Sequence, residues 1–131
     1  MKISLNKYLK NKLKKDITTY YSNDISDDYI SKLSKDWLND SSHQSSIKRL
    51  AVIRKYFPEA NRILDMAGGC GTFYFHGLIN GYDMYAIEPE DWKNSLIKMK
   101  IKENNYPKHW ANNFQSGYGE KLPYENNCFD F

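Results

Sequence analysis

The sequence predicts an α/β fold in which a parallel sheet follows a group of N-terminal helices. Three observations support this prediction. The chain before Pro58 shows only helical periodicity, short apolar runs alternate with helical patterns after Pro58, and glycine-containing turns separate these elements. Strands that alternate with helices pair in parallel, because each helix returns the chain to the same end of the sheet.

The composition is that of one globular domain. Of the 131 residues, 40% are hydrophobic and 15% are aromatic, which is enough to build a packed core. The formal net charge of +3 is too small to indicate a nucleic-acid partner, and we expect none. We divide the chain into an N-terminal helical segment, residues 1–58, and an alternating segment, residues 59–131.

The two cysteines, Cys70 and Cys128, indicate neither a disulfide framework nor a metal site. No second cysteine or histidine stands at zinc-finger spacing from either, so we predict no bound metal. Cys70 is expected to tolerate a turn rather than to react. The sequence contains no secretory leader and no run of about 18 apolar residues, so we expect a cytoplasmic protein without a membrane span.

An amphipathic helix is predicted at the N-terminus. In MKISLNKYLKNKLKK, Leu5, Leu9 and Leu13 recur every four residues, and six lysines occupy much of the remaining surface. Such a helix can dock on the domain through its leucines or lie on an anionic membrane surface. We favour docking, because a lysine-rich face is ordinary for a solvated helix.

A short helix and a polar loop are expected within residues 22–46. This stretch mixes the capping residues Ser, Asn and Asp with the spaced apolar side chains of Ile30, Leu33, Trp37 and Leu38.

Another helix is predicted over Gln44–Tyr56, and Pro58 ends it. Its apolar stripe consists of Ile47, Leu50, Ala51 and Ile53. His43 lies in the loop just before this helix, and a lone loop histidine is expected to be an ordinary surface residue.

The alternating segment contains strands of the parallel sheet. The predicted elements are a strand at Arg62–Met66, a helix at Thr72–Ile79, a strand at Met84–Ile87, a helix at Glu90–Glu103, a weaker strand at Phe114–Ser116 and the start of another strand at Phe129. In the helix at Glu90–Glu103, the predicted buried stripe is Trp92, Leu96 and Met99. Its lysines are expected to face water, namely Lys93, Lys98, Lys100 and Lys102.

The stretch ILDMAGGCGTFYF, Ile63–Phe75, has three glycines in four residues directly after a predicted strand. Ligands of parallel sheets bind at the carboxyl ends of the strands, where glycine lets the backbone approach the ligand. A dinucleotide site requires G-x-G-x-x-G, but counting from Gly69 the third glycine is replaced by Tyr74. Asp65, at the end of the strand, would also repel a pyrophosphate.

These residues resemble motif I of class I S-adenosylmethionine-dependent methyltransferases, which has an apolar pair, an acid and spaced glycines. YAIEPE, Tyr85–Glu90, resembles the second strand of that family with its terminal acid, Glu88. GYGEKLPYENNCFDF, Gly117–Phe131, resembles the segment that passes the adenine and enters the fourth strand. The resemblance covers residues 63–131, and within that family the segment resembles a methyltransferase type 11-like domain. It implies a Rossmann-like parallel sheet, partial here, with the first three strands and the start of the fourth.

The resemblance implies that this chain binds S-adenosylmethionine through a defined set of residues. In the family pattern Glu88 holds the ribose hydroxyls, and Asp65 is placed to orient the ammonium end of the cofactor. The loop residues that open the backbone are Ala67, Gly68, Gly69 and Gly71. Tyr118 and Gly119 are expected to lie along the adenine. Two positions depart from the pattern, since Ala67 replaces the first glycine and Tyr118 replaces an acid found in many relatives.

The implied activity is methyl transfer to an acceptor that we expect to be a small molecule. The catalytic residues are unknown, because in this family the acceptor-side residues mostly follow the fourth strand. A non-catalytic module that binds the cofactor, or that acts through association, is the alternative. A nucleotide-dependent oxidoreductase is disfavoured by Tyr74 and Asp65.

The resemblance also implies that the chain stops where the fourth strand of the family begins. A sheet interrupted there has an apolar strand with one unpaired side. We therefore expect either a fragment of a longer methyltransferase or a protein that completes its sheet with a partner, including self-association through the unpaired strand edge.

Overall fold

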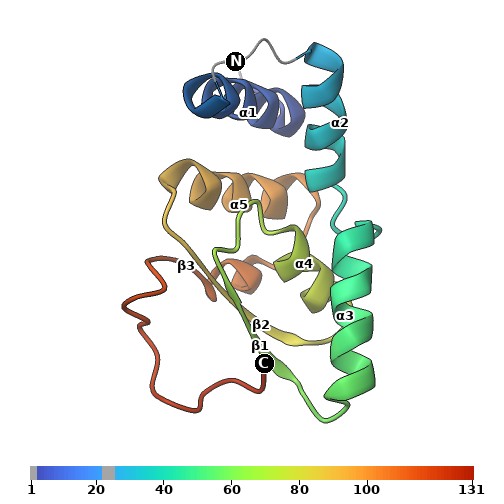
Figure 1. The fold of residues 1–131 in the computed structure, drawn as a ribbon, viewed down its shortest axis with the longest axis vertical. Coiled ribbons are helices and arrows are strands. Elements are labelled where there is room, and N and C mark those ends of the chain that lie inside the picture. The colour runs from blue at the N-terminus through green and yellow to red at the C-terminus, as the bar shows by residue number, and fades with distance from the viewer. Residues whose placement is uncertain (1–2, 22–25) are drawn as a thin grey trace.

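The computed structural model describes residues 3–21 and 26–131; Met1, Lys2 and residues 22–25, which fall in the predicted helical segments, lie outside the described residues. The elements are α1 (Leu5–Tyr21), α2 (Asp27–Trp37), α3 (Gln44–Tyr56), β1 (Arg62–Met66), α4 (Thr72–Ile79), β2 (Asp83–Glu88), α5 (Asp91–Glu103), the short 3-10 helix η1 (Lys108–Ala111) and β3 (Phe114–Ser116) (Figure 1). N-terminal helices followed by alternating strands and helices confirm the predicted α/β class.

The three strands form one parallel sheet in the spatial order β1-β2-β3. Ile63 of β1 stands opposite Met84 of β2, and Ala86 of β2 stands opposite Phe114 of β3. The sheet therefore has the parallel pairing that the alternation of strands and helices predicts, and it is consistent with a partial Rossmann-like fold.

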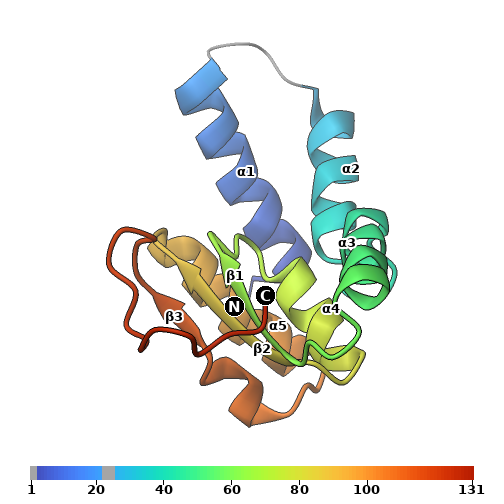
Figure 2. The same cartoon turned by 60° about the horizontal axis from the view of Figure 1, so that its bottom comes forward.

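The C-terminal segment that begins at Phe129 runs along the outer edge of β1 without forming a regular strand. The backbone N–H of Leu64 donates to the carbonyl of Phe131 at 3.0 Å, and the N–H of Asp130 donates to the carbonyl of Arg62 at 2.8 Å. In Figure 2 this segment ends beside β1. β1 is therefore flanked by β2 on one side and by this segment on the other.

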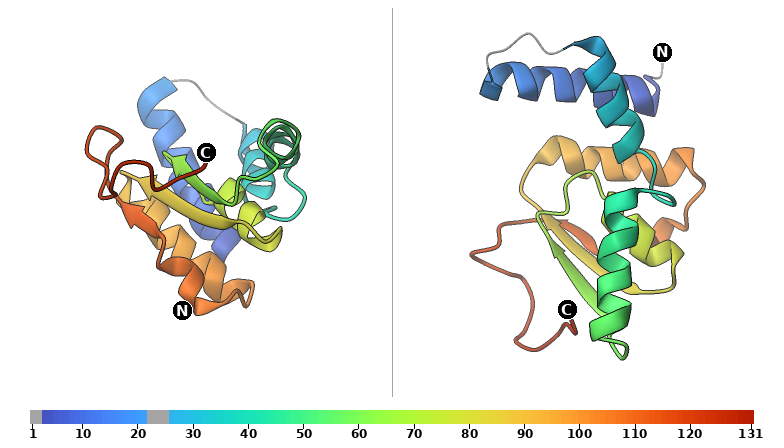
Figure 3. Two further views of the ribbon diagram at one scale, coloured as in Figure 1. Left: turned by 90° about the horizontal axis from the view of Figure 1, so that it is seen from below. Right: turned by 45° about the vertical axis from the view of Figure 1, so that its right-hand side comes forward.

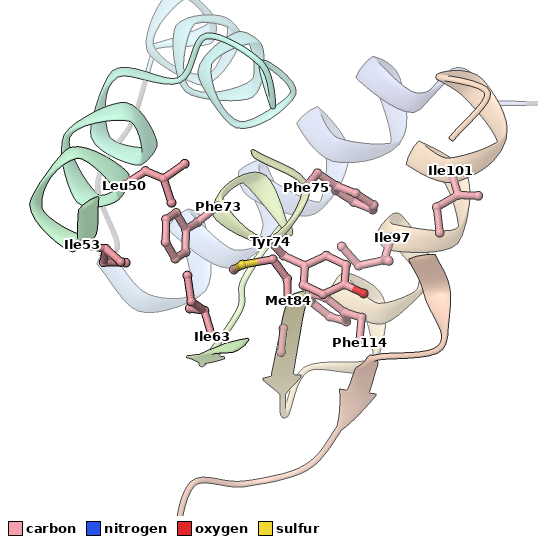
Figure 4. Close-up of a cluster of buried hydrophobic side chains, with 11 residues drawn as sticks. Leu50, Ile53, Ile63, Phe73, Tyr74, Phe75, Met84, Ile97, Ile101 and Phe114 are labelled. Carbon is pink, nitrogen blue, oxygen red and sulfur yellow. The ribbon is translucent and has the colours of Figure 1, made fainter. Parts of the chain in front are cut away.

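The two faces of the sheet are covered differently. Because successive side chains of a strand point to opposite faces, Ile63 and Met84 lie on one face, where they pack with α3, α4 and α5 in the main core (Figure 4). Tyr85 lies on the other face, where its ring contacts those of Tyr124 and Phe129. Helices thus cover one face, and the C-terminal segment covers part of the other.

α1 and α2 are docked against the rest of the fold rather than extended into solvent. Leu9 and Leu13 of α1 are buried with Ile30 of α2, Cys70 of the glycine loop and Leu96 of α5. Figure 3 shows α1 running alongside α5, with α2 next to α1. This confirms the docked arrangement expected for the N-terminal helix. Among the described residues, no helix has the length and apolar character needed to cross a bilayer.

The apolar stripe predicted for α3 is only partly correct. Leu50 and Ile53 are buried in the main core, but Ile47 is 39% exposed and Ser46 is buried in its place. The reason is that α3 packs on the side of α4, so only a narrow stripe of the helix is covered. Ser46 lies in the first turn of the helix, and its hydroxyl is 2.8 Å from Nδ1 of the capping residue His43.

Lys100 was expected to face water, and this prediction is wrong. Its side chain is fully buried, and its ammonium group donates to Asp40 Oδ1 at 2.7 Å and to the carbonyl of Trp37 at 2.8 Å. The predicted stripe of α5 is also only partly correct, because Leu96 is buried but Trp92 and Met99 are half-buried, and Ile97 and Ile101 are buried instead. α5 lies between the sheet and the N-terminal helices, so more than one of its faces is covered.

Candidate functional site

The glycine loop, residues 67–71, connects β1 to α4 at the carboxyl edge of the sheet. Gly69 and Gly71 adopt left-handed backbone conformations, with φ angles of 60° and 75°. A Cβ atom on Gly71 would stand 2.3 Å from Cδ1 of Ile97, so α5 can approach the loop only because this residue is glycine. The N–H of Gly68 donates to the carbonyl of Ile87 at 2.8 Å and fixes the loop to β2.

Ala67 also has a left-handed backbone, with a φ angle of 57°. This conformation is strained for a residue with a Cβ atom and is ordinary for glycine. The family pattern has its first glycine at this position. Here the residue is alanine, but its backbone adopts the left-handed conformation that is typical of glycine.

Glu88 ends β2 beside the glycine loop, as the sequence predicts. Its carboxylate is buried, with Oε1 accepting the N–H of Gly69 at 3.0 Å and Oε2 accepting the N–H of Glu90 at 2.7 Å. These bonds join the loop, the end of β2 and the start of α5. Each carboxylate oxygen has two lone pairs, so both oxygens keep the capacity to accept one further hydrogen bond.

Asp65 lies at the end of β1 and pairs with a cation from α3. The Nη2 atom of Arg49 is 3.2 Å from Asp65 Oδ1, and the Arg49 guanidinium lies 3.7 Å from the centre of the Phe73 ring. Burial raises the pKa of the Asp65 carboxyl, and the charge of Arg49 acts in the opposite direction. The carboxylate is therefore accompanied by one positive charge that is itself held against an aromatic face.

A pocket of about 300 Å³ opens on this side of the loop. Its wall on the sheet side is made by Asp65 and by the loop residues from Ala67 to Cys70. Its other walls are made by Trp37, His43, Ser46, Arg49, Thr72, Phe73 and Lys93. The pocket is therefore lined by one buried carboxylate and two cationic side chains, Arg49 of α3 and Lys93 of α5, and Lys93 also pairs with Glu90 at 3.2 Å.

The predicted adenine residues lie at the same edge of the sheet but outside this pocket. The N–H of Gly117 donates to the carbonyl of Glu88 at 3.3 Å, so the chain leaving β3 passes the end of β2. A Cβ atom on Gly119 would stand 3.5 Å from Cε of Met66, which places Gly119 next to the end of β1. Tyr118 is 64% exposed. The structure thus brings Asp65, the loop, Glu88 and Gly119 to one edge of the sheet, with Tyr118 exposed beside them.

Arg49, Lys93 and Trp37 are site residues that sequence reasoning missed. Arg49 and Lys93 lie on helices whose lysines and arginines are expected to face solvent. The spacing of these two residues does not distinguish them from the other basic residues of the same helices. Trp37 precedes a polar loop, and its position in the pocket depends on how α2 docks. The one signal that the sequence offers is Arg49, a basic residue near the start of the helix that precedes the glycine loop. Basic residues are common at such positions, so this signal does not by itself identify a site.

His43 has a more specific role than the surface residue that we expected. Its Nδ1 atom accepts the backbone N–H of Ser46 at 3.2 Å, which caps α3, and its Nε2 atom lies 3.1 Å from Asp36 Oδ2. Since Nδ1 accepts a backbone hydrogen bond, the ring proton sits on Nε2 and points to Asp36. His43 thus caps α3 and lines the pocket, and the lone pair of its Nδ1 atom is used by the bond from Ser46.

Cys70 is not a nucleophile in this structure. The side chain is 5% exposed, and burial raises the pKa of its thiol to about 12. The thiol is therefore protonated at neutral pH, despite its position next to the start of α4. This supports the expectation that Cys70 only occupies a place in the turn.

Comparisons of the chain with models of protein families, with curated proteins and with solved structures gave no match. The geometry of the loop, its two carboxylates and the pocket is therefore the basis on which a function can be proposed.

Proposed function

We propose that the alternating segment, residues 59–131, binds S-adenosylmethionine and that the chain is the cofactor-binding part of a methyltransferase for a small-molecule acceptor. The observation that carries this proposal is the position of Glu88. Glu88 is the last residue of β2, and its Oε1 atom lies 3.0 Å from the amide nitrogen of Gly69, on the glycine loop that follows β1. An acid at the end of the second strand, next to such a loop, is suited to a ribose diol.

The pocket fits the amino-acid end of the same cofactor. S-adenosylmethionine carries an ammonium and a carboxylate on one carbon atom, and the pocket offers Asp65 for the first group and Arg49 and Lys93 for the second. In the structure Arg49 and Asp65 bind each other at 3.2 Å. A ligand with an ammonium group and a carboxylate group can bind Asp65 and Arg49 at the same time. Neither side chain would then be left without an opposite charge in this buried site.

Tyr74 and Asp65 argue against a dinucleotide in this site. Tyr74 takes the place of the third glycine of a dinucleotide loop, and it is fully buried, with its hydroxyl donating to the carbonyl of Trp110. α4 therefore cannot come as close to the sheet as a glycine at this position would allow. Asp65 adds a buried negative charge where a pyrophosphate would lie.

The residues of this chain contribute binding and orientation to methyl transfer. The cofactor, when bound, supplies an electrophilic methyl group. Glu88 and Asp65 would hold its two ends, so that the reacting group keeps one direction, and Trp37 and Phe73 exclude water from the pocket between α3 and the loop. Because the Nδ1 lone pair of His43 caps α3, we assign no general base.

Calorimetric titration and thermal unfolding with S-adenosylhomocysteine test the proposal, with NADH as the competing ligand. At about 100 times its dissociation constant, a ligand of the folded state adds roughly 2.7 kcal/mol to the free energy of unfolding. We expect this stabilisation with S-adenosylhomocysteine and none with NADH. Stabilisation by NADH alone would overturn the assignment.

The Glu88→Gln variant tests the residue that carries the assignment. The amide oxygen of glutamine can still accept the N–H of Gly69, but the charge that holds the diol is lost, so affinity should fall by ~1–3 kcal/mol. Asp91→Asn, an exposed acid in the first turn of α5, is the matched control and should leave affinity unchanged.

Binding without methyl transfer to any acceptor would favour the non-catalytic module.

A further inference from the structure

A second cavity lies between α1 and α2, away from the glycine loop. Its volume is about 550 Å³, and it is lined by Asn6 and Lys10 of α1, Ser31 and Lys35 of α2, and Leu38 and Asn39 of the connection that follows α2. Figures 1 and 3 show α1 and α2 side by side above α5. We call this cavity the α1–α2 groove.

The amide side chains of the α1–α2 groove present hydrogen-bond donors. Asn39 Oδ1 accepts the backbone N–H of Ser42 at 3.2 Å, and Asn6 Oδ1 accepts the hydroxyl of Ser34 at 2.9 Å. Each amide oxygen thus accepts one hydrogen bond from the protein, and the NH₂ group of each side chain can donate to a ligand. Together with two ammonium groups and the hydroxyl of Ser31, the polar lining consists of groups that can donate.

The positive charge of Lys10 and Lys35 is not neutralised by neighbouring acids. Among the residues that line the groove in the described part of the chain, none is acidic. Of the nearest acids in sequence, Asp40 is paired with the buried Lys100, and Asp36, which contacts the His43 ring at 3.1 Å, does not line the groove. The acids of the first turn of α2 lie roughly 11 Å further along the helix, at 1.5 Å per residue.

Lys35 is also not required to cap α2, although it lies in its last turn. The terminal carbonyls already have donors. The carbonyl of Ser34 accepts the N–H of Leu38, the carbonyl of Asp36 accepts the N–H of Asn39, and the carbonyl of Trp37 accepts both Lys100 Nζ and Thr72 Oγ1. A hydrogen bond from Lys35 to these carbonyls is therefore not needed to end the helix.

We propose that the α1–α2 groove binds the phosphate group of a phosphate ester. A phosphate dianion matches the two lysine charges, and its oxygens can accept from several donors at once. The volume of the groove, about 550 Å³, exceeds that of a phosphate ion and leaves room for part of the esterified molecule. This site is independent of the proposed cofactor site.

Nitrogen-15 NMR titration of the whole chain with inorganic pyrophosphate tests the proposal. The backbone amides of Lys10, Lys35 and Asn39 should shift in a saturable manner, while those of Gly69 and Glu88 should not move. Shifts confined to the glycine loop, or no saturable shift at all, would overturn the proposal.

Two double variants separate a site from general charge attraction. Lys10→Gln with Lys35→Gln should weaken pyrophosphate binding by about tenfold or more. Lys98→Gln with Lys108→Gln removes the same formal charge from exposed positions of α5 and η1. This control should change the affinity for pyrophosphate by less than about twofold. Equal weakening in both variants would contradict a defined site. Since all four lysines lie outside the buried core, circular dichroism should show the native fold in both proteins.

A short oligouridylate distinguishes the two sources of the phosphate. If it displaces pyrophosphate and binds more tightly, the phosphate belongs to a nucleic-acid backbone. If pyrophosphate binds and the oligonucleotide does not, the ligand is a free phosphate ester. Failure of both probes contradicts the proposal, and none of these outcomes depends on S-adenosylhomocysteine.

Discussion

Lys100 of α5 donates a 2.7 Å hydrogen bond to Asp40, and both side chains are buried. Asp40 also accepts from the Tyr106 hydroxyl at 2.8 Å, and the ammonium of Lys100 also reaches the carbonyl of Trp37. Trp37 is the last residue of α2 and lines the pocket at the glycine loop, and Asp40 lies in the connection between α2 and α3. This ion pair therefore joins the N-terminal helices to α5 and supports one wall of the pocket.

Replacing Lys100 by Met should lower the free energy of unfolding by about 3–5 kcal/mol, because the carboxylate of Asp40 would stay buried without its cation. Urea unfolding followed by circular dichroism measures this. Lys98→Met is the matched control, since Lys98 is exposed on the same helix, and we expect a change within about 0.5 kcal/mol.

The double variant Lys100→Met with Asp40→Leu should recover part of the lost stability, because it removes the unpaired charge along with the pair. Equal stability of the Lys100→Met and Lys98→Met proteins would show that the Lys100–Asp40 pair is not buried in solution.

Local sequence signals were sufficient to predict most element boundaries. The bounds of α3, β1 and α4 agree with the prediction, because Pro58, the glycine loop and the Asn80-Gly81 turn interrupt the chain at those places. The burial of Lys100 could not be predicted in this way. Helical periodicity identifies one apolar face, but it does not show that a connection 60 residues earlier covers another face with a carboxylate.

The part of the site that lies at the ends of the parallel strands could be predicted from the sequence. Asp65 and Glu88 end adjacent parallel strands, so they had to reach the same edge of the sheet. Arg49 comes from α3, and its position depends on how that helix packs beside α4. No periodicity within α3 carries that information. The cofactor itself remains a prediction from the resemblance and the geometry.

Ala67→Gly should stabilise the protein by roughly 0.5–1 kcal/mol. The left-handed backbone at this residue costs about 1–2 kcal/mol with a Cβ atom, and the greater freedom of glycine in the unfolded chain offsets part of the gain. Chemical unfolding measures the change. Gly71→Ala is the opposite test and should destabilise, because its Cβ would meet Ile97. Destabilisation by Ala67→Gly would contradict the strained conformation.

Asp130 should make stability depend on pH through its contacts with β1. Its Oδ2 atom accepts the backbone N–H groups of Asn61 and Arg62 at 2.9 and 2.8 Å, and these bonds hold the pKa of the carboxyl below its ordinary value of 3.8. The unfolded chain therefore binds a proton at a higher pH than the folded chain does. The contribution is complete above the ordinary pKa and is lost as the pH falls through the lower folded value.

We therefore expect Asp130→Asn to lower the urea midpoint at neutral pH, with a gap to the parent protein that narrows as the pH falls below 3.8. Glu125→Gln, an exposed acid in the same segment, is the control and should show no such gap. A gap of constant size across this range of pH would mean that the ionised carboxylate makes no contribution.

Cys70 and Cys128 should differ sharply in their reaction with a thiol reagent at pH 8. Burial raises the pKa of the Cys70 thiol to about 12, so only about one molecule in ten thousand carries the thiolate at that pH, and the side chain is also closed to the reagent. Cys128 is partly exposed and should react first. In the Cys128→Ser protein, labelling should be slow in buffer and complete in denaturant. Rapid labelling of that variant in buffer would show that the glycine loop opens, and that the close approach of α5 at Gly71 does not persist in solution.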